Sequence, residues 1–315
     1  MPRMIPERTP SRLAAVSIAL ALVFPLLGCN DRTAPAFDEA RAFQSLESQV
    51  AFGPRVPGTP AHERCRDWIA AELTKAGATP VLQEFPDTVY GQPYRFTNVR
   101  ARFGPTDGAW IVLGAHWDTR PMADRDPDPA KRNQPIPGAN DGASGVAVLL
   151  ELARTFQAAP PPVGVELVFF DGEDLGRGAD VDGFCRGSRH YVKALEHPRP
   201  ALAIVLDMVG DKDLNLYYEV NSRQSARNLV ERLWAGARKV NAPGFIPEER
   251  HNVYDDHAPF LEAGIPGIDV IDFDFVAWHT TADDVPQVSA NSLGQVGRTV
   301  LRYVYTSEWE GAPPR

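Results

Sequence analysis

Carboxylates and histidines that could bind a metal ion recur at the ends of the apolar segments of this 315-residue chain. His116 and Asp118 follow one segment, Glu173 and Asp174 follow another, and Asp207 follows a third. The other candidates are Asp141, in the glycine-rich loop 138–145, and His279, beyond the apolar run 268–271. A single residue of this kind usually caps a turn or forms a hydrogen bond. Carboxylate and imidazole ligands together, without thiolates, suit a catalytic Zn²⁺ with an open position.

The elements that must position these side chains alternate along the chain, with no internal repeat. Apolar runs long enough for one buried strand each cover residues 110–115, 165–170, 201–206 and 268–271. Helical periodicity covers residues 37–50, 62–76, 146–156, 187–195, 225–240 and 289–305. Strands alternating with helices predict a largely parallel sheet covered on both faces, with ligands beyond the C-terminal strand ends. Crowding carboxylates at that edge is costly unless a cation or protons neutralise them.

The overall charge argues against a nucleic acid or an anionic membrane as the partner. The formal net charge is -9 and the isoelectric point is about 5.3. No block of basic residues stands out in the sequence, and such blocks are the usual signature of those partners.

The N-terminal residues have the pattern of an export signal. Arg3, Arg8 and Arg12 precede an apolar stretch at 13–27, which is too short to span a membrane comfortably. The stretch ends in Leu-Leu-Gly-Cys29, which resembles the lipobox of bacterial lipoproteins, where the mature chain begins at a lipidated cysteine. A plain signal peptide followed by a chance cysteine is the alternative.

We therefore expect a lipoprotein-type signal peptide at 1–28, a tether at 29–36 and one catalytic domain at 37–315. The protein would be exported, as a periplasmic or cell-envelope lipoprotein that meets the membrane only through its lipid anchor. Cys65 and Cys185 remain in the domain, either as a disulfide or as two buried free thiols.

Seven segments in order, from about residue 52 to residue 305, resemble the clan of zinc aminopeptidases and glutaminyl-peptide cyclotransferases. They are GPRVPGT, AHWD, GANDGASG, FFDGED, LDMVG, YDDHAPF and WHTTADD. The resemblance implies a single-domain, three-layer α/β/α fold with a mixed, largely parallel central sheet.

The resemblance also implies roles for individual residues. Asp141, Asp174 and His279 would bind zinc, Glu173 would be the general acid and base, and Asp118 would hold His116 or shape the site. In the two-metal aminopeptidases, His116 and Asp207 would complete a second zinc site, with Asp141 bridging both ions. In the cyclases one zinc is usual, and Asp207 would join a hydrogen-bond network instead.

Three features favour the cyclases over the aminopeptidases. Asp255 in the YDDHAPF segment, Trp278 before His279, and the long loop 119–137 all resemble cyclase patterns. Trp278, Phe273 and Phe275 would form the substrate pocket. The loop 175–183 departs from the animal cyclases because it lacks their tryptophan, which places the match in the bacterial branch.

The sequence thus predicts conversion of N-terminal glutamine of peptides to pyroglutamate with release of ammonia. Zinc would polarise the carboxamide, Glu173 would transfer the proton, and Asp207 and Asp255 would share a proton beside it. The alternatives are a zinc aminopeptidase with one or two metal ions and a binding protein on the same scaffold. A binding protein would lack ligands or Glu173, and neither is missing.

Overall fold

The computed structural model describes residues 1, 4, 34–178 and 180–306. Apart from Met1 and Met4, the predicted signal peptide lies outside the described residues, as do Cys29 and most of the predicted tether. None of the described helices is long and apolar enough to cross a membrane.

A six-stranded mixed sheet forms the centre of the domain, in the order β1-β2-β4-β3-β5-β8. Strands β4, β3, β5 and β8 run parallel, while β2 pairs antiparallel with both β1 and β4. The predicted mixed, largely parallel sheet is confirmed, and each parallel strand lies within one residue of its predicted bounds. The strands are β1 (Val81–Val89), β2 (Gln92–Phe103), β3 (Trp110–His116), β4 (Gly164–Phe170), β5 (Leu202–Asp207) and β8 (Gly267–Ile271). Strands β6 (Leu216–Tyr218) and β7 (Phe245–Glu249) form a separate parallel pair.

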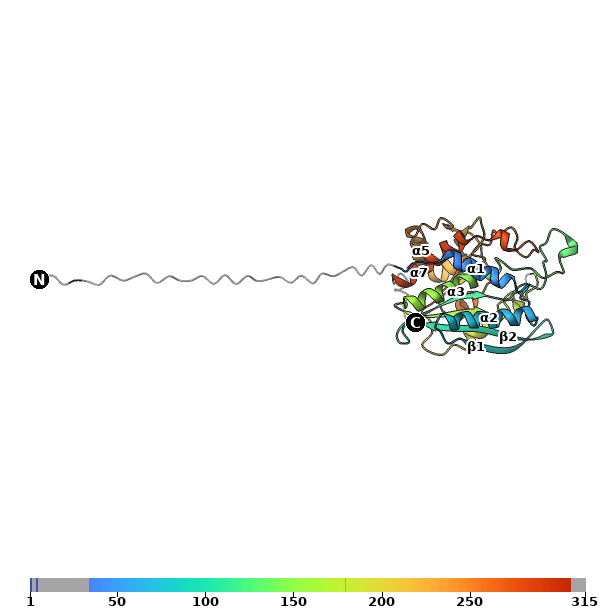
Figure 1. The fold of residues 1–315 in the computed structure, drawn as a ribbon, viewed down its shortest axis with the longest axis horizontal. Coiled ribbons are helices and arrows are strands. Elements are labelled where there is room, and N and C mark those ends of the chain that lie inside the picture. Colours follow the sequence, from blue (N-terminus) through green and yellow to red (C-terminus); the bar gives the residue numbers. More distant parts are fainter. Residues whose placement is uncertain (2–3, 5–33, 179, 307–315) are drawn as a thin grey trace. The chain divides into compact units, whose positions relative to one another are not determined.

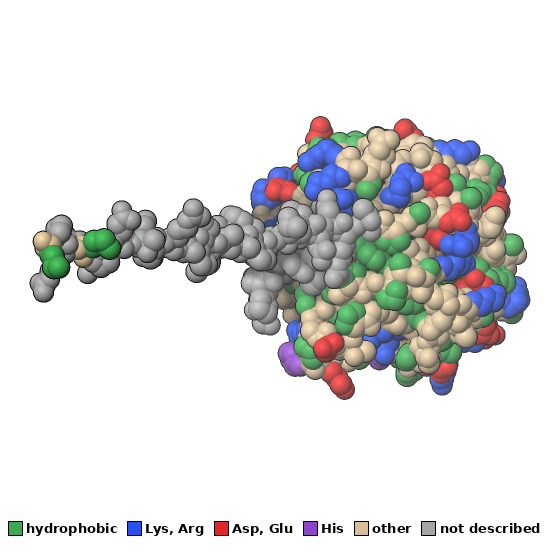
Figure 2. All heavy atoms as spheres, turned by 60° about the vertical axis from the view of Figure 1, so that its left-hand side comes forward, with side chains coloured by type: hydrophobic (Ala, Val, Ile, Leu, Met, Phe, Trp, Pro, Cys, Tyr) green, Lys and Arg blue, Asp and Glu red, His purple; other side chains and the backbone are tan. Residues whose placement is uncertain are grey.

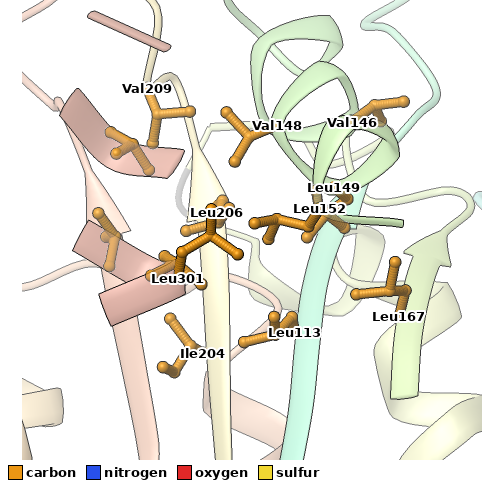
Figure 3. Close-up of a cluster of buried hydrophobic side chains, with 14 of the residues drawn as sticks. Leu113, Val146, Val148, Leu149, Leu152, Leu167, Ile204, Leu206, Val209 and Leu301 are labelled. Carbon is orange, nitrogen blue, oxygen red and sulfur yellow. The ribbon is translucent and has the colours of Figure 1, made fainter. Parts of the chain in front are cut away.

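Helices cover both faces of this sheet (Figure 1). The larger core lies beneath five helices on one face, where Leu113, Leu167 and Ile204 project from the strands toward helix side chains such as Leu149 (Figure 3). Intervening strand residues such as Val112 face the opposite way, toward α4 and α6. The five helices are α1 (Glu39–Val50), α2 (Pro60–Lys75), α3 (Ala143–Ala158), α5 (Val220–Lys239) and α7 (Ala290–Tyr305), and the two opposite them are α4 (Arg186–Lys193) and α6 (Ala258–Glu262).

The β1–β2 hairpin adds two antiparallel strands that periodicity did not predict. Tyr90 and Gly91 turn the chain with φ of 49° and 77°, and Val89 pairs with Gln92 across the turn. Positive φ at both central positions is the requirement of a tight two-residue hairpin turn. Most β1 side chains are exposed or half-buried, so no continuous apolar run marks this strand in the sequence.

Charged side chains of both signs are interspersed on the face drawn in Figure 2. On that face no basic patch stands out, which agrees with the net charge of -9.

Candidate metal centre and active site

The predicted ligands converge at the C-terminal edge of the parallel strands. Asp174 follows β4, Asp141 precedes α3, and His279 lies beyond β8 with φ of 56°. Ligand atoms of these three buried residues all lie within 4.8 Å of one another. The Nε2 atom of His279 is 3.5 Å from Oδ1 of Asp174 and 3.8 Å from Oδ2 of Asp141.

This triad fits a divalent metal ion. Donors bound to one tetrahedral ion at about 2.0–2.2 Å lie roughly 3.3–3.6 Å apart, close to the observed separations. Oδ2 of Asp174 is buried without a hydrogen-bond partner. Burial lowers the pKa of His279, but the charge of Asp174 and the hydrogen bond to Asp124 outweigh it and raise that pKa to about 9. The carboxylates therefore favour a protonated His279, and a bound cation could compensate their negative charge in place of that proton.

Arg120 and Asp124, both in the loop between β3 and α3, hold two of these ligands from outside. Nη1 of Arg120 donates to Oδ1 of Asp174 at 2.7 Å, and the same guanidinium pairs with Asp124 at 2.8 and 3.1 Å. Asp124 in turn lies 3.4 Å from Nδ1 of His279. Outer partners of this kind orient metal ligands. No local pattern in the sequence identifies either residue.

A second group of potential ligands shares Asp141. Nε2 of His116 lies 3.2 Å from Oδ1 of Asp141 and 3.2 Å from Oδ1 of Asp207, and it is hydrogen-bonded to Asp207. Gly142 permits this approach, since a Cβ there would lie 2.4 Å from Nε2 of His116.

Asp118 supports the loop that carries Glu173 and Asp174. Its carboxylate accepts the backbone N–H groups of those two residues at 3.0 and 3.3 Å, whereas Nδ1 of His116 is 3.6 Å away, beyond hydrogen-bond distance. Of the two interpretations from the sequence, the contacts favour the shaping of the site.

Glu173 lies beside the metal ligands in an environment that favours its protonated form. Burial, and then the negative charge of Asp174, raise the pKa of Glu173 well above its usual value. The Cys185 thiol donates to Oε1 of Glu173 at 3.4 Å, and ligand atoms of both lie within 4.8 Å of Asp255. Burial and the neighbouring Asp207 raise the pKa of Asp255 to about 6. These carboxyl groups can therefore hold and exchange a proton near neutral pH.

A cavity of about 220 Å³ opens over this edge of the sheet. Trp278 and Phe273 line it, with their ring centroids 4.8 Å apart, and the Trp278 ring lies 4.0 Å from that of His279. Phe275, predicted for the same wall, is not among the lining residues and packs with Met208, Val253, Ile271 and Ala277. The loop 175–183 lacks the tryptophan of the animal cyclases, and on that side the cavity wall is formed by Gly178, Val181 and Phe184.

Comparison with known proteins assigns the chain to a family. Residues 98–304 match the sequence profile of peptidase family M28. The chain belongs to that family.

Two solved structures illustrate the range of activities in this M28 group. Glutaminyl cyclase from Tannerella forsythia is 39% identical, with a TM-score of 0.81 over 86% of this chain and 99% of that one. A Zn-dependent exopeptidase from Parabacteroides distasonis is 37% identical, with a TM-score of 0.83 over the same shares. Among curated proteins, the glutaminyl-peptide cyclotransferase of Bothrops jararaca is 27% identical over 291 residues, covering 79% of this chain and 76% of its own. The resemblance inferred from the seven segments and the predicted fold class are both confirmed.

Two further residues of this M28 chain hold the loop before Asp141, and both lie in segments that carried the resemblance. The Asp283 carboxylate accepts the backbone N–H groups of Asn140 and Asp141 at 2.8 and 3.1 Å. The buried guanidinium of Arg55 donates to the carbonyl oxygens of Pro137 and Gly138 at 2.7 and 2.6 Å. The sequence motifs contained these residues, but their partners are far away along the chain and no local pattern reveals them.

Both domain cysteines are buried free thiols, which decides between the alternatives left open by the sequence.

Proposed function

We propose that this M28 chain is a zinc-dependent glutaminyl-peptide cyclotransferase, which converts N-terminal glutamine of peptides and proteins to pyroglutamate and releases ammonia. The observation that carries the proposal is the small aromatic-walled cavity with Glu173 and the Asp141–Asp174–His279 triad among its lining residues. At about 220 Å³ it is smaller than the roughly 300–1,000 Å³ of drug-sized sites, so it suits one terminal residue.

Asp141, Asp174 and His279 would hold the zinc ion through two carboxylate oxygens and one imidazole nitrogen. When bound, zinc would supply Lewis-acid polarisation of the substrate carboxamide oxygen. Trp278 and Phe273 would orient the flat carboxamide and keep bulk water away from it.

Glu173 would move the proton that the reaction requires. The glutamine α-amine forms a bond to the side-chain carbonyl carbon, and the bond from that carbon to its amide nitrogen breaks. Glu173 would take the proton lost by the attacking amine and return it to the leaving nitrogen, so ammonia departs neutral. A carboxyl group with a raised pKa suits both transfers. Asp255 would keep Glu173 in position. It would also share a proton with the neighbouring carboxylates, since closely spaced carboxylates cannot all ionise cheaply.

The runner-up is an aminopeptidase, and one observation favours it. His116, Asp141 and Asp207 have ligand atoms within 4.8 Å of one another, so the chain carries a second metal-competent group. A second metal ion would help to generate a hydroxide nucleophile for hydrolysis. Cyclisation needs no water nucleophile and therefore no second ion.

The products distinguish the two reactions. A purified soluble domain should release ammonia from Gln-initiated peptides and leave Leu-anilide intact. Rapid hydrolysis of Leu-anilide without ammonia from Gln-peptides would establish the aminopeptidase instead.

We also propose that the protein is exported and anchored through Cys29. The support is the charged N-terminal segment, the apolar stretch at 13–27 and the Leu-Leu-Gly-Cys sequence that ends it. Replacement of Cys29 by Ser should move the protein from the membrane fraction to a soluble one, because the acyl chains would supply the anchor. An unchanged distribution of wild type and variant between the two fractions would refute lipidation.

A further inference from the structure

The mouth of the cavity carries a positive charge whose role is not explained by the reaction. In the described part of the chain, four of the residues that line the cavity are exposed and mark its mouth: Arg125, Gly178, Val181 and Asn252. Of these four, Arg125 alone is charged. Its guanidinium carbon lies 4.9 Å from the centroid of the Trp278 ring, the aromatic wall of the cavity.

The backbone holds Arg125 in place from both sides. Its own N–H donates to the carbonyl oxygen of His279 at 3.1 Å. The next residue, Asp126, accepts hydrogen bonds from the N–H and hydroxyl groups of Thr281 at 3.0 and 2.6 Å. The loop that carries Arg125 is thus attached to the segment that carries His279, and the guanidinium lies over the Trp278 ring.

The neighbouring charges leave Arg125 without a carboxylate partner. Asp124 pairs with Arg120 and His279, and Asp126 is occupied by Thr281. Among the described residues, no ion pair or hydrogen bond involves the guanidinium of Arg125, which lies over the face of the Trp278 indole.

A peptide bound for cyclisation would bring its second and third residues past this cation. Its first residue fills the cavity, so the following residues must leave through the mouth beside Trp278 and Arg125. The protein carries a net charge of -9 and acidic groups line the cavity, so it would otherwise disfavour an acidic peptide.

We propose that Arg125 selects peptides with a carboxylate in the residues that directly follow the N-terminal glutamine. This inference rests on the proposed cyclotransferase function and specifies its substrate class. The guanidinium would stay stacked on Trp278 while it donates hydrogen bonds to the carboxylate, an arrangement that arginine supports and lysine reproduces poorly.

The test compares Gln-Glu-Ala-amide, Gln-Lys-Ala-amide and Gln-Ala-Ala-amide by the kcat/KM for ammonia release. The C-terminal amide removes the terminal carboxylate as a competing partner, and Gln-Ala with a free carboxyl group tests that source separately. Wild type should prefer the Glu peptide over the Lys peptide by about two- to fivefold at low salt, as expected for an exposed ion pair. The preference should shrink at high salt because screening weakens exposed pairs.

Arg125→Gln should abolish this preference, and Arg125→Lys should retain only part of it. The ratio between peptides is the readout, since loss of the stacked guanidinium could slow all peptides together. Arg102→Gln is the matched control: Arg102 also stacks on a tryptophan, with its guanidinium carbon 4.3 Å from the Trp110 ring, but lines a different pocket, and its loss changes the net charge equally. That variant should keep the wild-type ratio.

Two failures are distinguishable. If all Gln-peptides release ammonia but Arg125→Gln leaves the Glu-to-Lys ratio unchanged, the role of Arg125 is refuted and the cyclotransferase function stands. If no Gln-peptide releases ammonia, both proposals are wrong.

Discussion

His279 and His116 approach different oxygens of the Asp141 carboxylate, and the two halves of the site that they define are held in different ways. In the first half, Arg120 and Asp124 contact Asp174 and His279 from outside, and Oδ2 of Asp174 has no partner. In the second half, His116 is hydrogen-bonded directly to Asp207. Each half thus keeps a buried polar atom without a partner, Oδ2 of Asp174 in the first and Nδ1 of His116 in the second, but side chains outside the ligand set orient the ligands of the first. We therefore propose that a single metal ion would bind in the first half, where the ligands are already oriented.

The largest effect should follow from a change in the first half. Asp174→Asn removes a charged ligand and leaves Arg120 paired with Asp124 alone, so we expect loss of the bound zinc together with cyclase activity. Metal analysis of the dialysed variant, beside the ammonia assay, checks this. A variant that keeps full zinc and full turnover would remove Asp174 from the ligand set.

Glu173→Gln should separate proton transfer from metal binding. The amide keeps the shape of the side chain but cannot exchange the proton, so the rate should fall by about 10²–10⁴-fold. Zinc content should stay at the wild-type level, because the proposed ligands are unchanged. Near-normal turnover by the metal-replete variant would exclude Glu173 from the mechanism.

A smaller effect is expected from the outer partners of the first half. Arg120→Gln should weaken zinc affinity by about 10–100-fold, as losses of outer partners commonly do. A competition titration with a chelator measures it. The control is Arg154→Gln, since Arg154 pairs with Glu72 and Glu151 on the helices and makes no contact with the site. Equal affinities in both variants would show that Arg120 does not support the ligand.

The two halves also show what the sequence could and could not predict. Asp174 follows a strongly apolar strand, Asp141 lies in a glycine-rich loop and His279 lies beyond another apolar strand. Because parallel strands bring such ends to one edge, these side chains could be expected to lie together, whereas their choice as zinc ligands came from the family resemblance. Arg120, Asp124 and Cys185 could not be identified, because their roles depend on partners brought close only by folding. Phe275 differs from the prediction: it was expected in the pocket wall, but it is not among the lining residues and packs with Met208, Val253 and Ile271, which are.

Helix starts could be predicted where the capping residue is one of the usual types. α7 begins directly after Ser289, whose side chain caps the helix, so its observed start is within one residue of the predicted start. α5 begins five residues before its predicted start, because Glu219 caps it through two backbone N–H groups and glutamate is not a usual capping residue.

The most direct test of a single-metal site is the zinc stoichiometry of wild type and His116→Ala, measured with their cyclase rates. His116 belongs to the second half alone, so we expect one zinc ion per chain in both proteins and a rate change of less than about tenfold, the low end of losses for residues outside the ligand set. Two zinc ions in wild type, falling to one in His116→Ala with loss of activity, would contradict a single-metal site and establish a two-metal enzyme.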